Sequence, residues 1–361
     1  MAELANVLMD NRIKIGIAAA IVIGVIVTSI PTFGTLFSGN GGSGESESKI
    51  LRIGYFPNIN HAQAVIGLGT GDFQEALGND VEVRTQIFNA GPSAIEALFA
   101  NQIDVTYIGP NPAINGYVES NGEALRILSG AASGGAVFVV RNDAGIDSVD
   151  DFANKKFASP QLGNTQDVAL RKYLLENGYE TKENGGNVEV LPAKNADIVT
   201  LMVKKDIDGA WVPEPWGAKL VKEANARIFL DERELWPEGE FVTAHIIART
   251  DYLERNPEII SKLLEAHIDE TNWINENQDE AVAVFNAELE KLTGKTIPED
   301  EFKAGLSRMT LTWDPIKQSL VKSANDAFDI GFFDERPDLS EIYDLTLLND
   351  ILSRRGLAEI Q

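Results

Sequence analysis

The sequence has no cysteine and only three histidines among its 361 residues. Without cysteine the protein cannot form disulfide bonds, zinc ribbons, iron–sulfur clusters or a thiol nucleophile, nor carry a lipid on an N-terminal cysteine. The histidines, His61, His245 and His267, do not share the spacing of metal ligands. We therefore expect neither a metal site nor a cofactor.

Positive charge is also scarce. Lys and Arg number 31 against 55 Asp and Glu, which gives a formal net charge of -24. Phosphate backbones are bound by clustered Lys and Arg, so nucleic acid is not expected as a partner. Hydrophobic residues make up 44% of the chain and charged residues 24%, which is typical of a globular protein, and the length leaves room for two domains.

A long hydrophobic run occurs near the N-terminus. Residues 15–37 contain no charged side chain and are long enough for one membrane-spanning helix, which needs about 20 apolar residues. Arg12 and Lys14 precede the run and two glutamates follow it, an asymmetry that predicts the following body outside the cytoplasm. A cleaved signal peptide is the alternative, but its apolar region is shorter, about 7–15 residues.

The N-terminal part therefore has three expected segments. They are a short cytoplasmic N-terminus (1–14), a transmembrane signal anchor (15–37) and a Gly/Ser-rich linker (38–49). A linker of this composition behaves as a flexible tether. A single span offers no path for transport, so the function is expected in the body that follows.

In the body, short apolar runs alternate with amphipathic segments as far as Arg249. Such alternation predicts an α/β protein with parallel sheets and right-handed crossovers. Strand signals stop after Arg249, and Asn256 and Pro257 then start a predicted helix with Ile259 and Leu263 on one face. The remainder is expected to be a helical C-terminal tail that packs back on the first part of the body.

Four predicted helices begin directly after a strand with small and polar residues. The four starts are 57–61, 91–93, 109–112 and 163–167. Ser93 and Glu96 have the spacing of a capping box, and Asn111 and Asn164 are predicted N-caps. In open α/β sheets ligands bind beyond the carboxyl ends of the strands, where these helices start.

Converging helix starts could hold an anion without Lys or Arg, through unpaired N–H groups and the positive ends of the helix dipoles. Capped helices also occur in α/β proteins for purely structural reasons. The pattern therefore leaves a polar-ligand cleft and ordinary packing as two open interpretations.

A stiff loop over 208–216 holds two tryptophans, two prolines and Glu214 after a predicted strand. Trp211 predicts either an aromatic wall beside a ligand or a packing corner. The small residues of 129–135 suit a close backbone approach, a hinge or a loose turn. Among the histidines, one is expected to pack in the core (His267) and two are candidate ligand contacts (His61 and His245).

Four segments occur in the order found in a known family. They are LRIGYFPNINHAQAVIGLGTGDF at 51–73, AGPSAIEALFANQIDVTYIGPNPAI at 90–114, FVVRNDAGIDSVDDFANKKFASPQLGNTQDVALRKYLLENGY at 138–179 and VKKDIDGAWVPEPW at 203–216. Together they resemble the substrate-binding proteins of ABC importers in the aliphatic sulfonate, taurine and nitrate group. That superfamily also contains binders of a thiamine pyrimidine precursor. The resemblance covers residues 49–275 and is not specific to one ligand.

The resemblance implies a two-lobed α/β periplasmic-binding-protein fold of type II, with crossover strands at 136–141 and 243–248. Lobe one would comprise residues 50–138 and 246–361, and lobe two residues 139–245. The ligand would lie between the lobes, and closure would be a hinge motion about the crossovers.

The resemblance also implies ligand-binding positions in both lobes. They are Phe56, Asn58, His61, Gly91, Pro92, Ser93, Gly109 and Asn111 in lobe one, and Gly163, Asn164, Thr165, Gln166, Trp211 and Glu214 in lobe two. Because Glu214 would repel an anion, we expect it either to turn away or to pair with an amine of the ligand.

The expected function is a receptor, tethered to the membrane outside the cytoplasm, that captures a small oxyanion solute and delivers it to an ABC permease and its ATPase. The alternative is a receptor for a thiamine pyrimidine precursor or a similar small heterocycle, in which Glu214 pairs with an amine. A pyrimidine-synthase-like enzyme that uses His61 is disfavoured, because such enzymes are intracellular and the chain has no catalytic motif. We expect no catalytic residue.

Overall fold

The computed structural model of the chain describes residues 49–361. The predicted cytoplasmic segment and membrane anchor, and all of the predicted linker except residue 49, lie outside the described residues. No helix within 49–361 combines the length and the apolar character needed to cross a membrane.

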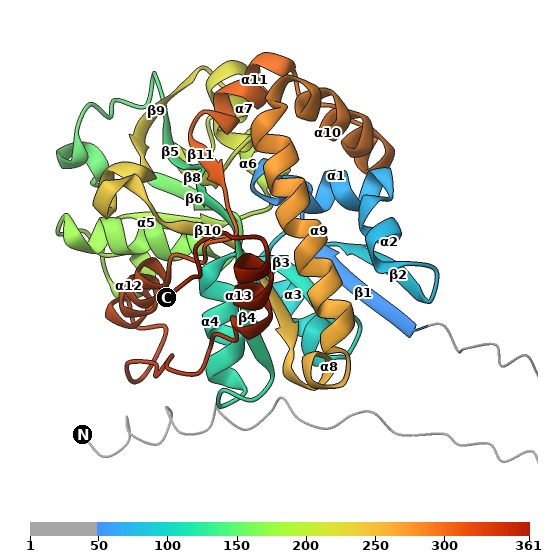
Figure 1. Cartoon of the computed structure of the whole chain (residues 1–361). Helices are drawn as coiled ribbons and strands as arrows, with labels where there is room; N and C mark the ends of the chain where they lie inside the picture. Colours follow the sequence, from blue (N-terminus) through green and yellow to red (C-terminus); the bar gives the residue numbers. More distant parts are fainter. Residues whose placement is uncertain (1–48) are drawn as a thin grey trace, which may run out of the picture. The chain divides into compact units, whose positions relative to one another are not determined.

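Two β-sheets form the framework of the body (Figure 1). The strands of the first sheet, in spatial order, are β11 (Met309–Leu311), β4 (Leu125–Gly134), β10 (Val242–Arg249), β3 (Val105–Ile108), β1 (Lys49–Tyr55) and β2 (Val81–Ile87). Those of the second are β7 (Glu189–Pro192), β6 (Lys156–Ser159), β8 (Gly209–Pro213), β5 (Ala136–Arg141) and β9 (Ala226–Asp231). β1 pairs in parallel with β2 and β3, and β6 with β7 and β8, as the strand–helix alternation predicts.

Helices cover both sheets. The first sheet is accompanied by α1 (Ala62–Thr70), α2 (Asp72–Leu77), α3 (Gly91–Phe99), α4 (Pro110–Glu119), α8 (Thr250–Arg255), α9 (Pro257–Glu276), α10 (Gln278–Thr293), α11 (Glu299–Leu306), α12 (Lys317–Asp329) and α13 (Thr346–Arg354). The second is accompanied by α5 (Thr165–Glu176), α6 (Asn195–Lys204) and α7 (Trp216–Glu223). We call the first sheet with its helices lobe one, and the second sheet with its helices lobe two.

The chain passes between the two sheets twice. β4 in the first sheet is followed almost directly by β5 in the second, and β9 connects to β10 of the first sheet through residues 232–241. β5 and β10 each run antiparallel to both of their neighbours. The predicted lobe limits at 138 and 245 fall inside these two strands.

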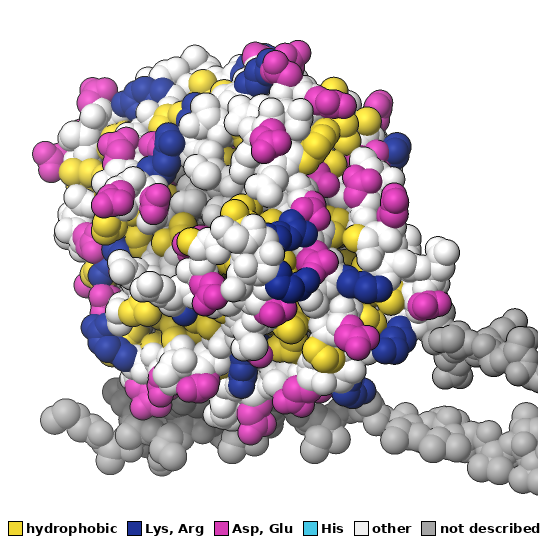
Figure 2. Space-filling view, in the orientation of Figure 1, with side chains coloured by type: hydrophobic (Ala, Val, Ile, Leu, Met, Phe, Trp, Pro, Cys, Tyr) yellow, Lys and Arg dark blue, Asp and Glu magenta, His cyan; other side chains and the backbone are white. Residues whose placement is uncertain are grey.

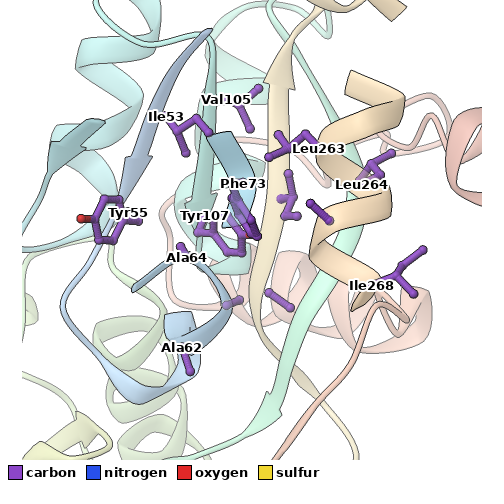
Figure 3. Packing of buried hydrophobic residues seen from close by; sticks show 14 of the residues in the cluster. Ile53, Tyr55, Ala62, Ala64, Phe73, Val105, Tyr107, Leu263, Leu264 and Ile268 are labelled. Carbon is purple, nitrogen blue, oxygen red and sulfur yellow. The ribbon is translucent and has the colours of Figure 1, made fainter. Parts of the chain in front are cut away.

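Helix α9 confirms the helix predicted to begin at Asn256 and Pro257, with the proline at an initial position. Its predicted apolar face, which includes Ile259 and Leu263, is buried against the first sheet. Figure 3 shows Leu263 on this helix beside Val105 of β3. Each buried large aliphatic side chain contributes about 2 kcal/mol, so this face holds the C-terminal tail on lobe one.

Two features of the first sheet differ from the sequence prediction. The small-residue run 129–135 is not a loose turn: it belongs to β4 as far as Gly134, because β10 and β11 pair with it on either side. Its small residues do permit a close backbone approach, since a Cβ at Gly130 would lie 2.0 Å from the carbonyl oxygen of Asp314. β11 lies after Arg249, so the prediction that strands end there is wrong; with three residues it is too short to show an alternation pattern.

The surface carries both signs of charge. On the face shown in Figure 2, acidic side chains lie among lysines and arginines. Exposed ion pairs such as Arg354 with Glu265 contribute about 0–1 kcal/mol each. The excess of acidic residues is therefore a property of the solvated surface. The charge of a binding site depends on the residues that line it.

Candidate ligand-binding site

A cavity of about 20 Å³ lies between the lobes, where the carboxyl ends of β1 and β3 meet those of β6 and β8. Lobe one lines it with Phe56, Asn58, Asn60, His61, Asn89, Ala90, Gly91, Gly109, Pro112 and Thr243. Lobe two contributes Asn164, Thr165, Gln166, Asn195 and Pro213. These residues include the starts of α3, α4 and α5 and the 3-10 helix η1 (Ile59–His61). The predicted helix starts therefore gather around one hollow.

Eight of the fourteen residues predicted for the site line this cavity. They are Phe56, Asn58, His61, Gly91, Gly109, Asn164, Thr165 and Gln166. The six that do not are Pro92, Ser93, Asn111, Gly163, Trp211 and Glu214. Local signals found the helix starts, but several side chains at those starts point elsewhere.

Sequence reasoning missed seven of the lining residues. They are Asn60, Asn89, Ala90, Pro112, Asn195, Pro213 and Thr243. Asn60, Pro112 and Pro213 lie inside the predicted segments 57–61, 109–112 and 208–216, and Asn89 and Ala90 directly precede the helix start at 91–93. Asn195 at the start of α6 and Thr243 on β10 had no sequence signal.

The predicted capping roles of Ser93 and Asn111 are wrong. In α3 the N-cap is Ala90, and Pro92 lies in the first turn, so Ser93 is already inside the helix and caps nothing. In α4 the N-cap is Gly109, and the Asn111 side chain donates from Nδ2 to the carbonyl oxygen of Ser323 at 3.2 Å. In both cases a proline begins the helix earlier than the capping residue suggested.

The prediction for Asn164 is confirmed. It is the N-cap of α5, and its Oδ1 accepts a hydrogen bond from the backbone N–H of Gln166 at 3.3 Å. Gly163 precedes this cap, and its carbonyl oxygen lies 3.5 Å from Nδ2 of Asn115 in lobe one. This helix start therefore faces lobe one while it lines the cavity.

Trp211 is a core residue and not an aromatic wall of the cavity. Its side chain is fully buried in lobe two, stacked on Phe138 with ring centroids 5.3 Å apart. Its Nε1 donates to Oε2 of Glu232 at 2.6 Å. The packing interpretation of this tryptophan is therefore the correct one.

Glu214 is also fully buried and lies outside the lining of the cavity. Its Oε1 accepts from Nη1 of Arg308 at 2.6 Å, and its Oε2 accepts from the backbone N–H of Ala218 at 3.0 Å. Burial raises the pKa of this carboxyl, and the hydrogen bonds and the arginine act in the opposite direction. The expectation that Glu214 turns away from the ligand agrees with this arrangement.

The lining of the cavity contains no Asp, Glu, Lys or Arg. Six of its residues carry a carboxamide, namely Asn58, Asn60, Asn89, Asn164, Gln166 and Asn195. A carboxamide offers both N–H donors and an acceptor oxygen without net charge. The cavity is therefore polar and uncharged, although the chain as a whole is strongly acidic.

Several polar atoms in this cavity have no partner within residues 49–361. They are Asn60 Oδ1, His61 Nδ1, Thr165 Oγ1 and Asn195 Oδ1. A buried polar group without a hydrogen bond costs about 1–3 kcal/mol. Four such atoms around one cavity are typical of a binding site for a polar ligand.

His61 contributes a neutral imidazole to this lining. The side chain is 1% exposed and its ring centroid lies 4.6 Å from that of Phe56. Desolvation lowers the pKa of His61 to about 3, because the charged form has no compensating partner nearby. At neutral pH it therefore offers one N–H and one lone pair.

The other two histidines belong to lobe one outside the cavity. His267 packs in the core as predicted, with Nδ1 3.0 Å from the Tyr107 hydroxyl and Nε2 2.9 Å from the carbonyl oxygen of Gly130. His245, a candidate ligand contact, is buried with Nε2 3.1 Å from the carbonyl oxygen of Pro315 and does not line the cavity. No group of three metal-ligating side chains occurs in the described part of the chain.

The two lobes touch directly at the rim of the cavity. A Cβ at Gly109 would lie 2.4 Å from Oγ1 of Thr165 across the boundary, so only glycine permits this approach. Trp216, at the start of α7, donates from Nε1 to Oδ1 of Asn58 at 3.1 Å. These contacts bring the polar ends of both lobes together.

Ion pairs join the lobes further from the cavity. Lys172 on α5 lies 2.8 Å from Asp329 on α12, and Lys222 on α7 lies 2.9 Å from Asp300 on α11. Helices α11 and α12 bury their apolar sides in lobe one. The C-terminal tail therefore packs on lobe one as predicted and also contacts lobe two through α11 and α12.

Two sheets, joined by two connections and enclosing a polar cavity, define the fold class of the periplasmic binding proteins. The periplasmic nitrate-binding protein NrtA of Synechocystis PCC 6803 has a similar fold, with a TM-score of 0.67 at 17% identity over 85% of this chain and 89% of that chain. The alkanesulfonate-binding protein SsuA of Xanthomonas axonopodis pv. citri, solved with MOPS bound, also has a TM-score of 0.67, at 16% identity over 80% of this chain and 96% of that chain.

Sequence comparison gives the family. The chain belongs to the NMT1-like family, whose model matches residues 44–287. The taurine-binding periplasmic protein of Escherichia coli is 22% identical over 206 residues, which cover 57% of this chain and 61% of that protein. These relatives and structural neighbours are binding proteins, so the prediction of a binding protein that is not an enzyme is confirmed.

Proposed function

We propose that this protein is the solute receptor of an ABC importer and that it captures a small oxyanion of the sulfonate, taurine or nitrate type between its lobes. The observation that carries the proposal is the uncharged, amide-lined cavity at the meeting point of helix starts from both lobes. The names of the relatives support the same ligand class, since they bind taurine, alkanesulfonates and nitrate.

The proposed binding relies on neutral donors. Helix N-termini present backbone N–H groups and the positive end of the dipole, which favour an anion without a cationic side chain. A hydrogen bond to a charged group contributes about 1.5–3 kcal/mol, so three or four of them hold a monovalent oxyanion firmly. Phe56 offers an apolar surface to the organic part of a sulfonate.

Lobe motion is part of the proposal. A hollow of about 20 Å³ holds little more than a water molecule. A solute of several heavy atoms therefore requires the lobes to separate and to close again around it. The bodies that separate would be lobe one and lobe two, joined by the connections between β4 and β5 and between β9 and β10.

The heterocycle receptor gains no support from Glu214. That carboxylate was expected to pair with a ligand amine, but it is bound to Arg308 and lies outside the lining. No acidic side chain lines the cavity. We therefore put forward the oxyanion alone.

The proposed cellular setting follows from the sequence. The apolar run 15–37 would anchor the protein in the cell membrane with its body outside the cytoplasm, and the linker 38–49 would let that body reach a permease. The permease and its ATPase are the partners that receive the solute.

The test is calorimetric titration of the full chain, solubilised in detergent, with nitrate, taurine, short alkanesulfonates and bicarbonate. We expect one of these anions to bind with one-to-one stoichiometry. Gln166→Leu removes a lining carboxamide and should weaken that binding at least tenfold, whereas Gln102→Leu, at an exposed glutamine outside the cavity, should leave it unchanged. Absence of binding by every anion would overturn the proposal.

A further inference from the structure

Trp216 does not line the cavity but is hydrogen-bonded to a residue that does. Its indole is partly buried against the apolar cluster of lobe two, and its Nε1 donates to Oδ1 of Asn58 in lobe one at 3.1 Å. Asn58 is 6% exposed and lines the cavity. One hydrogen bond therefore joins a lobe-two side chain to a cavity residue of lobe one.

This hydrogen bond determines which way the Asn58 carboxamide faces. An indole N–H can only donate, so the atom of Asn58 that meets it must be the oxygen. Nδ2 is left with its two N–H donors, and the Nε1–Oδ1 bond is the only side-chain hydrogen bond of Asn58 within residues 49–361. Asn58 therefore presents donors, and not its acceptor, to the remaining polar space beside it.

A similar arrangement occurs at a lining residue of lobe two. Oδ1 of Asn164 accepts from the backbone N–H of Gln166, which is also a group that can only donate. The Asn164 amide is thereby oriented with its Nδ2 donors free. One carboxamide from each lobe is thus held with its oxygen occupied and its N–H groups available.

We infer that Trp216 is a positioning residue, an inference that rests on the proposed function. Because it holds the Asn58 oxygen, the closed cavity selects solutes that accept hydrogen bonds. Asn164 is oriented within lobe two by its own helix, so it keeps its direction when the lobes part. Asn58 depends on the other lobe. Separation of the lobes releases its amide, and closure sets it as a donor again.

This dependence couples recognition to closure. A solute that offers an acceptor to Asn58 is compatible with the Trp216 hydrogen bond, and both favour the closed state. A solute that offers an N–H donor at the same place needs the amide to rotate. Rotation would turn the NH₂ group toward the indole N–H, so that two donors face each other and the hydrogen bond between the lobes is lost. Selectivity thus comes from a residue that does not touch the solute.

The decisive variant is Trp216→Phe, which keeps an aromatic ring and removes the N–H. Loss of one hydrogen bond should weaken binding of methanesulfonate, or of whichever anion the wild type binds, about fivefold. Trp273→Phe is the matched control, because that tryptophan is partly buried in lobe one away from the cavity. Thermal unfolding of each variant verifies that it is folded.

Two further measurements distinguish positioning from general damage. In an Asn58→Ala background, Trp216→Phe should cause no additional loss, because the tryptophan acts through that amide. The preference for methanesulfonate over methanesulfonamide, which replaces an acceptor oxygen by an NH₂ donor, should fall in Trp216→Phe and stay unchanged in Trp273→Phe.

The outcomes separate this inference from the function on which it rests. Wild-type protein that binds no oxyanion overturns the proposed function, and the role of Trp216 falls with it. If the wild type does bind an oxyanion, three results would overturn the role of Trp216 alone. The first is equal affinity of Trp216→Phe and wild type, and the second is a full loss of affinity from Trp216→Phe in the Asn58→Ala background. The third is an unchanged preference of Trp216→Phe for methanesulfonate over methanesulfonamide.

Discussion

Arg308 and Glu214 form an ion pair between the lobes that is open to a quantitative test. The Arg308 guanidinium belongs to lobe one, directly after α11, and lies 2.6 Å from Oε1 of Glu214 in lobe two. The Glu214 side chain is 0% exposed and that of Arg308 is 20% exposed. Arg308→Met keeps an apolar side chain of similar reach and leaves the carboxylate with the backbone N–H of Ala218 as its remaining partner.

The expected loss of stability follows from this burial. Removal of one member of a buried ion pair costs about 3–5 kcal/mol, because the remaining charge has no compensation. The partial exposure of Arg308 places the expected value at the lower end, about 3 kcal/mol at pH 8. Arg354→Met, in which the lost pairs are exposed, should cost less than about 1 kcal/mol.

The pH dependence has a definite sign. Burial already raises the pKa of Glu214 in the folded protein, and removal of the arginine raises it further. A carboxyl whose folded pKa lies above its unfolded value supports stability at low pH and loses that support as pH rises through the folded pKa. The difference between wild type and Arg308→Met should therefore be largest at pH 8 and shrink toward pH 4.

Urea unfolding at pH 8 and at pH 5 measures both quantities. Arg308→Met combined with Glu214→Gln removes the buried charge and should recover most of the loss at pH 8. The reasoning is refuted if Arg308→Met costs no more than Arg354→Met, or if its loss is greater at pH 5 than at pH 8.

Two further predictions concern the cavity and the histidines. Gly109→Ala should weaken solute binding at least tenfold, because the added Cβ would meet Thr165 Oγ1 when the lobes are closed. The melting temperature should not fall, since the backbone of residue 109 at φ -71 suits alanine. Calorimetry measures the affinity, and Thr165→Ala in the same chain should restore part of it. Stability should fall as pH drops from about 6.5 toward 4, because burial lowers the pKa of His61 to about 3 and those of His245 and His267 to about 4, so the unfolded chain binds protons that the folded one does not.

The second prediction is checked by urea midpoints between pH 7 and 4.5 and by NMR titration of the imidazoles. Each histidine adds a slope of up to about 1.4 kcal/mol per pH unit. Imidazole signals that titrate near 6.5 in the folded protein would contradict it. For Gly109→Ala, unchanged affinity would show that the close approach to Thr165 is not needed for binding.

Local signals explain which parts of the site could be predicted. Asn164 follows a predicted strand and precedes a helical pattern, and its capping role is confirmed because a cap involves only neighbouring residues. Ser93 met the same rule and failed, since Pro92 starts α3 earlier. The preference for serine at the N-cap and the preference for proline in the first turn predict different starts for α3, and the sequence alone does not decide between them.

The two tryptophans of the segment 208–216 show a different limit of prediction from the sequence. The resemblance predicts Trp211 at the site, yet this indole is stacked in the lobe-two core, whereas Trp216 donates a hydrogen bond to Asn58 of lobe one. Both indoles lie in one short stretch with similar neighbours. Which of them faces the other lobe depends on how β8 packs in its sheet, and that is a property of distant residues.

The alternation of strands and helices and the composition of the helix starts are predictable from the sequence, because each depends on residues within one turn or one strand of each other. The tertiary structure decided which amides share a hollow, where β11 pairs, and that Glu214 faces Arg308 at a separation of 94 residues. Contacts of that range arise only when two lobes pack together, since the free energy that selects them is the burial of whole surfaces and not the preference of any local segment.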